Sequence, residues 1–550
     1  IEENQGEYTV NRTYDSEGNC TRITSSLGAD IRHTYDREGN LQTMQAGESW
    51  QASWVRDNTG LEVQRTFSGG VTVRTERDCF GREVHKSVRS GGIEQGAYRY
   101  QWGIANRLLS KENELTGTVT RYDYDRFDFL IRQETMQGSE TDVIYRVPDF
   151  VGNLFETPDK KDRKYGAGGK LLEDPDCFYH YDDEGNLIFR EFKQLQETGV
   201  KFDRKRMEKE RGIRCLATGT GWLYEWSSNG MLKKVIRPDG RPVEFRYDAL
   251  GRRTAKQYFG KVTRWVWDGN VPIHEWGYKV TDRQPNEKEN TPSKEPTEDI
   301  TTWVFEADTF VPTAKIQDGK QYSIVSDYLG TPIQMYDEQG NKVWDCTLDI
   351  YGNIFIINQG SAFDCPFRWA GQYFDFEINL YYNRFRYYSS EIGSYLSQDP
   401  IGVFSDKLNY YSYVDDTNNN IDIIGLEGAY VFVIDKKKKI AYVGKGKWAR
   451  FRKSVRHRTE EINGKRTKPT SWASKYYGND EFAEMVEARV IARMKKEDYI
   501  LVNKIASPGL KRYERADDAT KKLVDKAAND LVADMKSNQG KDIKKEPHHH

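Results

Sequence analysis

Short segments in which apolar and polar residues alternate recur along the first half of the chain. Residues 71–75 read Val-Thr-Val-Arg-Thr, and residues 222–226 read Trp-Leu-Tyr-Glu-Trp. An alternation with a period of two is typical of a β-strand that buries one face. Helical spacing is hard to find over residues 1–278, whereas Tyr, Trp and Phe are abundant there. The pattern therefore predicts a mainly β protein that begins with a long, winding sheet of hairpins.

A Tyr-Asp-x-x-Gly repeat separates these segments. Its copies begin at Tyr14, Tyr35, Tyr181, Tyr247 and Tyr336. We expect the tyrosine to end a strand, the Asp carboxylate to cap a turn, and the glycine to supply the positive φ that lets the chain reverse. Repeats of this kind stack, and on their own they leave open a propeller or an irregular β-solenoid without a cavity.

The pattern changes twice along the rest of the chain. Residues 281–298 are rich in Pro, Asn, Lys, Glu and Thr, which predicts a mobile linker near 279–300. Beyond residue 426, two apolar segments at 428–435 and 440–446 flank a lysine-rich turn and predict a hairpin. Residues 482–494 have the apolar spacing of an amphipathic helix. A small α/β domain is therefore expected after the β region.

Charge divides the chain at the same place. Residues 1–426 carry about 53 basic and 67 acidic side chains, whereas the remainder carries about 30 and 18. An acidic body joined to a basic tail suggests a polyanionic target for the tail. The six cysteines are widely scattered without a CxxC pair, which argues against a disulfide framework or a zinc ribbon. No apolar run is long enough to span a bilayer.

The two ends of the sequence suggest processing or engineering. The chain begins at Ile1 within repeat-like sequence, as expected of a fragment or a processed product, and no signal peptide is found. Residues 548–550 are three histidines, which we interpret as the remnant of a purification tag.

A dense series of turns and aromatic residues precedes the change at residue 426. It includes Asp-Tyr-Leu-Gly-Thr-Pro at 327–332, Phe-Arg-Trp-Ala-Gly-Gln-Tyr at 367–373, Leu-Tyr-Tyr-Asn-Arg-Phe-Arg-Tyr-Tyr at 380–388 and Tyr-Leu-Ser-Gln-Asp-Pro-Ile-Gly at 395–402. Together with the repeats, this series resembles the YD-repeat shell of Rhs proteins, insecticidal toxin-complex subunits and teneurins. The resemblance implies a β-shell whose sheet spirals into a container.

The same resemblance implies a self-cleaving aspartyl protease made of Asp399 and Asp422, which would cut between Leu426 and Glu427. Two carboxyl groups held close together cannot both ionise cheaply, so one keeps a proton while the other activates water. This sequence departs from the family pattern at three places: it has Ile423 where the family has Pro, Ser394 where an Arg is frequent, and Phe404-Ser405 in place of a Gly-Gly. As an alternative, both Asp-centred motifs are ordinary β-turns.

The basic tail has a combination of motifs that resembles the GIY-YIG nuclease domain over about residues 427–505. The combination is Gly-x-Tyr, a short turn, Tyr-Val-Gly, a later Arg, a Glu on a helix and Leu-x-Asn. The resemblance implies that Tyr430 and Tyr442 lie beside the scissile phosphate, with Tyr430 favoured as general base. Arg452 would stabilise the phosphoryl charge, and Glu487 would hold one divalent metal, Mg²⁺ by preference.

Other residues of the tail have supporting roles in this interpretation. Lys445 would lower the pKa of a neighbouring Tyr, and Asn503 would support the geometry of the site. His457 is a candidate for a family histidine, although Arg456 competes for that position. Glu484 replaces Glu487 if the helix register differs. The remaining basic side chains, Arg450 among them, would track phosphates and give affinity without sequence preference.

These features predict three domains: a YD-repeat shell at 1–326, a core with the autoprotease at 327–426, and a nuclease toxin at 427–547. The predicted function is a bacterial Rhs effector that encloses a nuclease, releases it by autocleavage and delivers it into competitor cells through a contact-dependent system, type VI being favoured. Such an effector would be made in the producer's cytoplasm and act in the target's cytoplasm.

The expected partners are a DNA or RNA substrate, an immunity protein, delivery proteins and a chaperone, together with a homodimer mate or second shell fragment. Two alternatives stay open. The chain could be a structural or adhesive shell whose basic domain binds without cutting, or it could be an insecticidal toxin-complex subunit.

Overall fold

The protein is described from a computed structural model, which divides into two compact units. The first unit comprises Ile1–Ser397 and Tyr411–Ile424, and the second comprises Gln398–Tyr410 and Gly425–His550. The structure describes residues 1–197, 199–282, 295–307, 309–399, 409–422, 428–435, 440–445, 471–476, 489–491, 494, 500–501, 521, 524–525, 528 and 532.

The first unit begins with a sheet of fourteen strands in sequence order, each antiparallel to the next. The strands are β1 (Glu2–Gln5), β2 (Tyr8–Tyr14), β3 (Cys20–Ser25), β4 (Asp30–Tyr35), β5 (Leu41–Ala46), β6 (Trp50–Arg56), β7 (Glu62–Phe67), β8 (Thr72–Arg77), β9 (Glu83–Ser90), β10 (Ile93–Trp102), β11 (Leu108–Asn113), β12 (Thr118–Tyr124), β13 (Leu130–Gln137) and β14 (Glu140–Tyr145). Two 3-10 turns, η1 (Ser68–Gly70) and η2 (Ile104–Asn106), lie in the connections.

A short pair, β15 (Val147–Pro148) and β16 (Leu154–Phe155), leads to a second sheet of sixteen antiparallel strands, again in sequence order. These are β17 (Lys164–Tyr165), β18 (Leu171–Glu173), β19 (Cys177–Tyr181), β20 (Leu187–Phe192), β21 (Gly221–Trp226), β22 (Leu232–Ile236), β23 (Pro242–Tyr247), β24 (Arg253–Tyr258), β25 (Lys261–Asp268), β26 (Val271–Lys279), β27 (Thr301–Phe305), β28 (Pro312–Gln317), β29 (Lys320–Ser326), β30 (Pro332–Tyr336), β31 (Lys342–Leu348) and β32 (Ile354–Gln359). The turns η3 (Ala167–Gly169) and η4 (Val280–Asp282) accompany it. The sheet continues across residue 326 without a break.

The repeat builds the hairpins as its residue types predict. In the first copy, the Asp15 carboxylate accepts the backbone N–H groups of Glu17 and Asn19 at 2.9 and 2.8 Å, and Gly18 has a φ of +84°. The strand register shifts by one residue at Tyr14, so the tyrosine closes the regular ladder. Residues 72–75 of the first alternating segment lie in β8, and the second segment, 222–226, lies in β21, which confirms the hairpin prediction.

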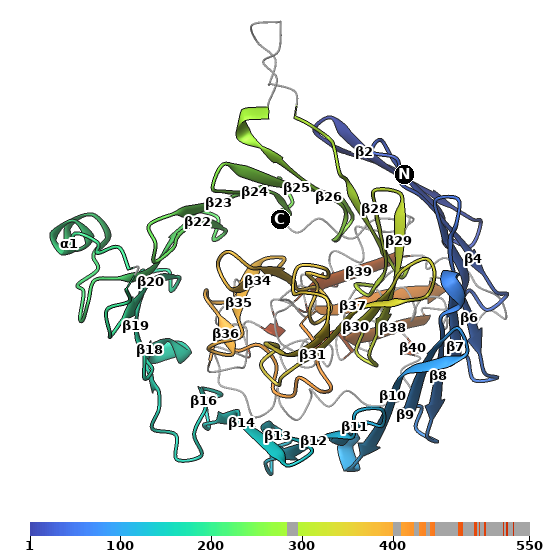
Figure 1. Cartoon of the computed structure of the whole chain (residues 1–550), viewed down its shortest axis with the longest axis horizontal. Coiled ribbons are helices and arrows are strands. Elements are labelled where there is room, and N and C mark those ends of the chain that lie inside the picture. Colours follow the sequence, from blue (N-terminus) through green and yellow to red (C-terminus); the bar gives the residue numbers. More distant parts are fainter. Residues whose placement is uncertain are drawn as a thin grey trace, which may run out of the picture. The chain divides into compact units, whose positions relative to one another are not determined.

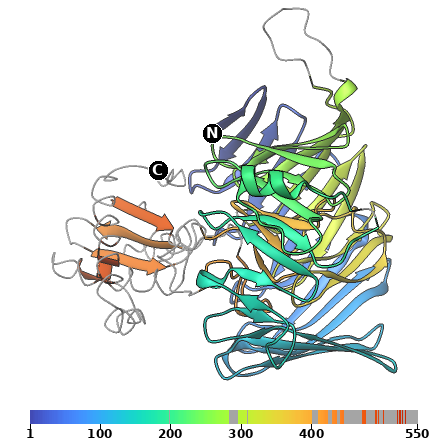
Figure 2. The ribbon, with the colours of Figure 1, turned by 90° about the vertical axis from the view of Figure 1, so that its left-hand side faces the viewer.

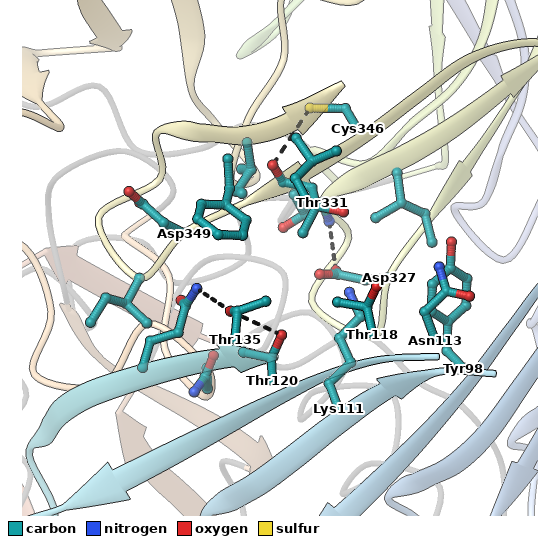
Figure 3. A pocket seen from close by; sticks show the side chains of 18 of the residues that line it. Tyr98, Lys111, Asn113, Thr118, Thr120, Thr135, Asp327, Thr331, Cys346 and Asp349 are labelled. Carbon is teal, nitrogen blue, oxygen red and sulfur yellow. Dashed lines mark hydrogen bonds between the residues drawn. The ribbon is translucent and has the colours of Figure 1, made fainter. Parts of the chain in front are cut away.

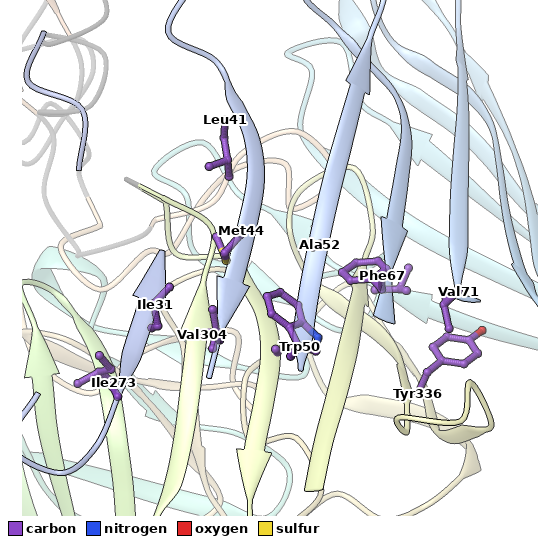
Figure 4. Packing of buried hydrophobic residues seen from close by; sticks show 14 of the residues in the cluster. Ile31, Leu41, Met44, Trp50, Ala52, Phe67, Val71, Ile273, Val304 and Tyr336 are labelled. Carbon is purple, nitrogen blue, oxygen red and sulfur yellow. The ribbon is translucent and has the colours of Figure 1, made fainter. Parts of the chain in front are cut away.

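The two large sheets pack face to face along an apolar seam. Buried residues of β2 and β4–β11 contact buried residues of β24–β30, and Figure 4 shows Met44 and Trp50 facing Val304 across this seam. The Trp50 indole also donates a hydrogen bond to the Ser323 hydroxyl at 3.0 Å. Figure 1 shows β28 and β29 alongside β4 and β6. Strands more than two hundred residues apart in sequence therefore share one core.

One histidine lies within this seam. His274 on β26 is fully buried; its Nε2 is 2.6 Å from the Ser25 hydroxyl, and its Nδ1 is 3.1 Å from the Thr302 hydroxyl. Burial lowers the pKa of His274 to about 4. The imidazole is therefore neutral in the fold, where it links the two sheets through hydroxyl partners.

A four-stranded sheet, called here the small sheet, packs against the sixteen-stranded one. It consists of β33 (Tyr373–Asp375), β34 (Leu380–Asn383), β35 (Arg386–Ser389) and β36 (Ser394–Tyr395). Its apolar residues join a core with residues of β18–β31. A buried ion pair between Arg253 and Asp375 and a 3.0 Å contact from Lys256 to Asp375 fix the small sheet to β24.

Two details of the first unit differ from expectation. A helix, α1 (Arg204–Arg211), occupies the region expected to be purely β, and it begins at the Asp203 N-cap and ends at Gly212 with a φ of +66°. Its charged sequence has little apolar periodicity, so pattern alone missed it. The predicted loop at 281–298 is anchored at its described end, because Glu295 pairs with Arg264 at 2.7 Å and Pro296 accepts the Trp276 indole N–H at 2.9 Å.

The second unit holds a sheet in the order β39-β37-β38-β40, shown in orange in Figure 2. Its strands are β37 (Gly428–Asp435), β38 (Ile440–Lys445), β39 (Ser471–Tyr476) and β40 (Ile500–Leu501). The hairpin of β37 and β38 confirms the prediction, whereas β39 was missed because its residues alternate weakly. Residues 489–491 and 494 are helical with Val490 and Met494 buried, in agreement with the helix expected at 482–494.

Two further observations concern the whole described chain. All six cysteines are free thiols. Within the described ranges, no helix has both the length and the apolar character needed to cross a bilayer.

Candidate functional site

The Asp422 carboxylate is held by two donors from the small sheet. Its Oδ2 accepts the Tyr395 hydroxyl at 2.9 Å and the Arg386 Nη2 at 3.2 Å. The Arg386 guanidinium lies over the Tyr395 ring, 3.6 Å from its centroid. The carboxylate thus receives one neutral and one cationic donor, and these two donors also stack on each other.

The Asp422 backbone is held as well. Its carbonyl oxygen accepts the Asn383 side-chain N–H at 2.9 Å, and its own N–H donates to the Tyr413 hydroxyl at 3.3 Å. The same Asn383 amide lies 2.6 Å from the Tyr395 hydroxyl. We call Asn383, Arg386, Tyr395, Tyr413 and Asp422 the Asp422 network. Every backbone polar group of Asp422 therefore has a side-chain partner from this network.

Local folding explains why these side chains meet. The pair β34–β35 turns sharply between Asn383 and Arg386, and β35 pairs with β36 so that Tyr388 lies opposite Tyr395. The tyrosines of these strands join Trp369 and Tyr413 in an aromatic core. This packing leaves Arg386 with 3% of its side chain exposed and Asp422 with 15%. The network is consequently shielded from water on the sheet side.

Burial and charge keep the phenols of the network protonated. Burial raises the pKa of Tyr395 well above its usual range, and the negative charge of Asp422 raises it further. The same two causes, in the same order, raise the pKa of Tyr413. Tyr395 therefore acts as a hydrogen-bond donor to the carboxylate at any physiological pH.

Asp399, the predicted partner of Asp422, is buried, and its backbone N–H donates to the Tyr410 carbonyl at 2.9 Å. Asp399 belongs to the second unit and Asp422 to the first. The pairing of the two carboxyl groups stays a prediction.

The predicted nuclease residues are described only in part. Tyr430 lies on β37 opposite Gly444, and Tyr442 lies on β38 opposite Phe432, so the two tyrosines occupy paired strands two positions apart in register. Lys445 ends β38. The predicted residues that lie outside the described part of the chain are Leu426, Glu427, Arg450, Arg452, Arg456, His457, Glu484, Glu487 and Asn503.

A cavity of about 100 Å³ lies elsewhere in the first unit, between β11–β13 and β30–β32 (Figure 3). The Thr120 and Thr135 hydroxyls are 3.3 Å apart on one wall, and Asp327 accepts the Thr331 backbone N–H at 2.9 Å on the other. Burial raises the pKa of Asp327 and lowers that of Lys111. None of the predicted site residues that the structure describes lines this cavity.

The sequence interpretation missed four members of the Asp422 network as functional residues. Arg386 and Asn383 lie in the recognised run at 380–388, and Tyr395 opens the first Asp motif, yet they were treated only as marks of resemblance. A buried arginine in a run of aromatic residues is itself a signal, because such a cation requires a nearby counter-ion. Which carboxylate fills that role emerges only from the fold.

The comparisons with known proteins concern mainly the β region. A family model described as the Teneurin YD-shell matches residues 71–421. The probable deoxyribonuclease RhsB of Dickeya dadantii is 27% identical over 441 residues, covering 76% of this chain and 27% of the relative. The double-stranded DNA deaminase toxin A of Burkholderia cenocepacia is 28% identical over 418 residues, covering 71% and 27%. The chain thus spans about a quarter of the length of these relatives.

Among solved structures, the chain resembles one described as the Photorhabdus luminescens Tc holotoxin pore with a TccC3 D651A mutation. The TM-score is 0.51 with 17% identity, and the match covers 76% of this chain and 21% of the other. At this identity the likeness shows the fold, which matches a YD-repeat β-shell. The likeness of residues 427–505 to GIY-YIG nucleases is not shown by these matches and stays a prediction.

Proposed function

Since the chain belongs to the Teneurin YD-shell family, we propose that it is part of a bacterial Rhs toxin whose β-shell carries a C-terminal nuclease and releases it by self-cleavage between Leu426 and Glu427. Relatives named as a probable deoxyribonuclease and a DNA deaminase toxin support a toxin that acts on nucleic acid. Delivery into competitor cells by a contact-dependent system, and protection of the producer by an immunity protein, complete the proposal.

The observation that carries the proposal is the fixed carboxylate of Asp422. It lies four residues before Leu426, at the point where the acidic region ends and the basic tail begins. The Asp422 carboxylate, carbonyl and N–H are held by side chains of other segments. Such preorganisation is typical of a reacting group.

The proposed cleavage is a hydrolysis that needs only the two aspartates. Water attacks the Leu426 carbonyl carbon while the ionised carboxylate takes a proton from the water and the protonated one donates to the carbonyl oxygen. The C–N bond then breaks, and the Glu427 nitrogen takes up a proton. The products are a Leu426 carboxylate and a tail that begins at Glu427.

For the released tail we propose phosphodiester cleavage. Tyr430 and Tyr442 lie on one hairpin, Arg452 would stabilise the phosphoryl charge, and Glu487 would hold Mg²⁺. A carboxylate suits this metal, whose preferred ligands are oxygens. When bound, the metal supplies charge stabilisation at the phosphate.

The test compares the parent chain with Glu487→Ala on plasmid DNA and total RNA, each with and without a chelator. We expect the parent to degrade one substrate in the presence of Mg²⁺, and the variant to lose most of that activity. Glu481→Ala, which changes another carboxylate of the same segment, is the control. Binding of either nucleic acid without degradation would instead favour the alternative of a shell with a nucleic-acid-binding domain.

A further inference from the structure

We infer that one edge of the sixteen-stranded sheet is a docking surface for an anionic phospholipid bilayer. The edge consists of the connection between β20 and β21, residues 193–220, and of the next two connections on the same side, residues 237–241 and 259–260. The strands β20 to β25 are antiparallel in sequence order, so alternate connections leave the sheet at one edge. We call these three connections the basic edge.

The longest connection of the basic edge is an anchored insertion in the repeat. It contains α1, which Figure 1 shows at the outer margin beyond β20. Met207 and Ile213 of the insertion pack into a core with residues of β20 and β21. The fully buried carboxylate of Glu191 accepts the backbone N–H groups of Leu216 and Ala217 at 2.7 and 2.9 Å. The exposed side chains of the insertion are therefore presented by a folded segment.

The insertion is basic, although the region of the chain that contains it is acidic. Its basic side chains are Lys193, Lys201, Arg204, Lys205, Arg206, Lys209, Arg211 and Arg214, and its acidic ones are Glu197, Asp203, Glu208 and Glu210. Within the described part of the chain, five exposed cations of the insertion form no ion pair, namely Lys201, Arg204, Lys205, Lys209 and Arg214. This excess of exposed positive charge is complementary to an anionic surface.

Exposed apolar side chains accompany these cations. Leu216 is 62% exposed and Val200 is 45% exposed, and the Val200 N–H donates to the carbonyl of Pro238 in the second connection at 2.7 Å. In the third connection, Phe259 is 73% exposed and has a φ of +46°. A bulky residue adopts this backbone conformation at a cost. A strained backbone that holds an aromatic ring in water indicates a role outside the packing of the fold itself.

Arg241 joins the second connection to the third. Its exposed guanidinium lies over the Phe259 ring, 4.4 Å from the centroid. A cation and an apolar ring are thus presented at the same point. At a bilayer surface the ring enters the boundary of the acyl chains while the guanidinium binds a lipid phosphate.

The arrangement of these side chains favours lipid over a protein or a nucleic acid. The apolar side chains stand on different connections, each beside exposed cations, whereas a protein interface needs a contiguous and closely packed apolar centre. Nucleic acid is bound mainly through cations and hydrogen bonds to phosphates, which gives no role to exposed aliphatic side chains such as Leu216 and Val200. A bilayer accommodates separate apolar side chains, because its acyl chains rearrange around each of them.

The experiment is co-sedimentation of the full chain with two kinds of vesicle, phosphatidylcholine alone and phosphatidylcholine with about a quarter phosphatidylglycerol. We expect binding to the anionic vesicles that weakens as salt is added. The double variant Lys205→Gln with Lys209→Gln should lower the partition coefficient at least about tenfold, because each cation near the surface contributes to binding. Leu216→Ser with Phe259→Ser should lower it about tenfold through the loss of apolar insertion.

Matched controls change the same kinds of side chain on the fourteen-stranded sheet. Arg37→Gln with Arg121→Gln removes two exposed cations. Phe80→Ser removes a ring that is 77% exposed at a hairpin turn and that also lies beneath an arginine, Arg82. Both controls should bind anionic vesicles like the parent chain. Circular dichroism of each chain checks its fold.

The possible results are distinct. Loss of binding confined to the two edge variants supports the inference. Absence of binding to anionic vesicles, equal binding to neutral ones, or equal loss in the controls overturns it. The basic tail is unchanged in every variant, so parent-like binding by both edge variants assigns the binding to the tail and also overturns it. If the edge variants lose binding to a short DNA duplex but keep their binding to vesicles, the edge is a nucleic-acid surface instead.

Discussion

The seam between the two large sheets should weaken as the pH falls, because His274 is neutral within it. Its pKa is about 4 in the fold, while an unfolded histidine titrates near 6.5. A histidine with a depressed pKa contributes stability that is fully present above the unfolded value and is lost as the pH falls toward the folded value. The sensitive range for this residue is therefore about pH 6.5 down to about pH 4.

The size of the effect follows from the two pKa values. Linkage gives a loss of about 2 kcal/mol in the free energy of unfolding between about pH 7 and about pH 5 from this one group. The physical cause is burial: His274 is fully enclosed, and its nitrogens face the Ser25 and Thr302 hydroxyls rather than a carboxylate. A proton on the ring would thus be poorly compensated.

The assay is urea unfolding of the parent and of His274→Gln at several pH values, monitored by tryptophan fluorescence because Trp50 and Trp276 lie in the same core. His274→Gln should be less stable than the parent near neutral pH, and this difference should shrink by about 2 kcal/mol toward about pH 5. A constant difference across this range would refute the reasoning, since His274 would then not be the titrating group.

Three further outcomes are expected. Arg253→Met should cost about 1.5–3 kcal/mol of stability, because the buried Asp375 then keeps Lys256 but loses its arginine partner, while Arg206→Met on exposed α1 should change little in the same denaturation assay. Gly340→Ala should lower the melting temperature more than Gly18→Ala; both have positive φ, but only the former places a Cβ in steric conflict with the Gly69 carbonyl oxygen. Native alkylation followed by mass spectrometry should label exposed Cys79, whereas Cys346, whose pKa burial raises to about 12, should react only after unfolding. Equal losses of stability in Arg253→Met and Arg206→Met would contradict these expectations. Equal decreases in melting temperature in the two glycine variants, or alkylation of Cys346 in the native chain, would do so as well.

The hairpins were predictable from sequence because their signals are local. Each Tyr-Asp-x-x-Gly copy contains the carboxylate, the glycine and the strand-ending aromatic residue within a few positions, so no distant residue is needed to define the turn. The hairpin of β37 and β38 could be predicted from sequence for the same reason.

The packing between distant segments was not predictable in this way. Period-two alternation shows that Trp50 faces a core, but not that Ser323 would accept its indole N–H. In the same way, the motifs mark Asp422 without indicating Arg386 as its partner, because the ion pair depends on how β35 lies beside the segment before residue 423. The helix α1 was not predicted, because the residues between its N-cap Asp203 and its C-cap Gly212 are highly charged and show little apolar periodicity.

Self-cleavage is tested most directly by the intact mass of the purified chain and the N-terminal sequence of any fragment, measured for the parent and for Asp422→Asn. The account predicts two fragments from the parent, the second beginning at Glu427, and one uncut chain from the variant. A single uncut parent chain, a fragment with a different first residue, or the same cleavage in Asp422→Asn would contradict it.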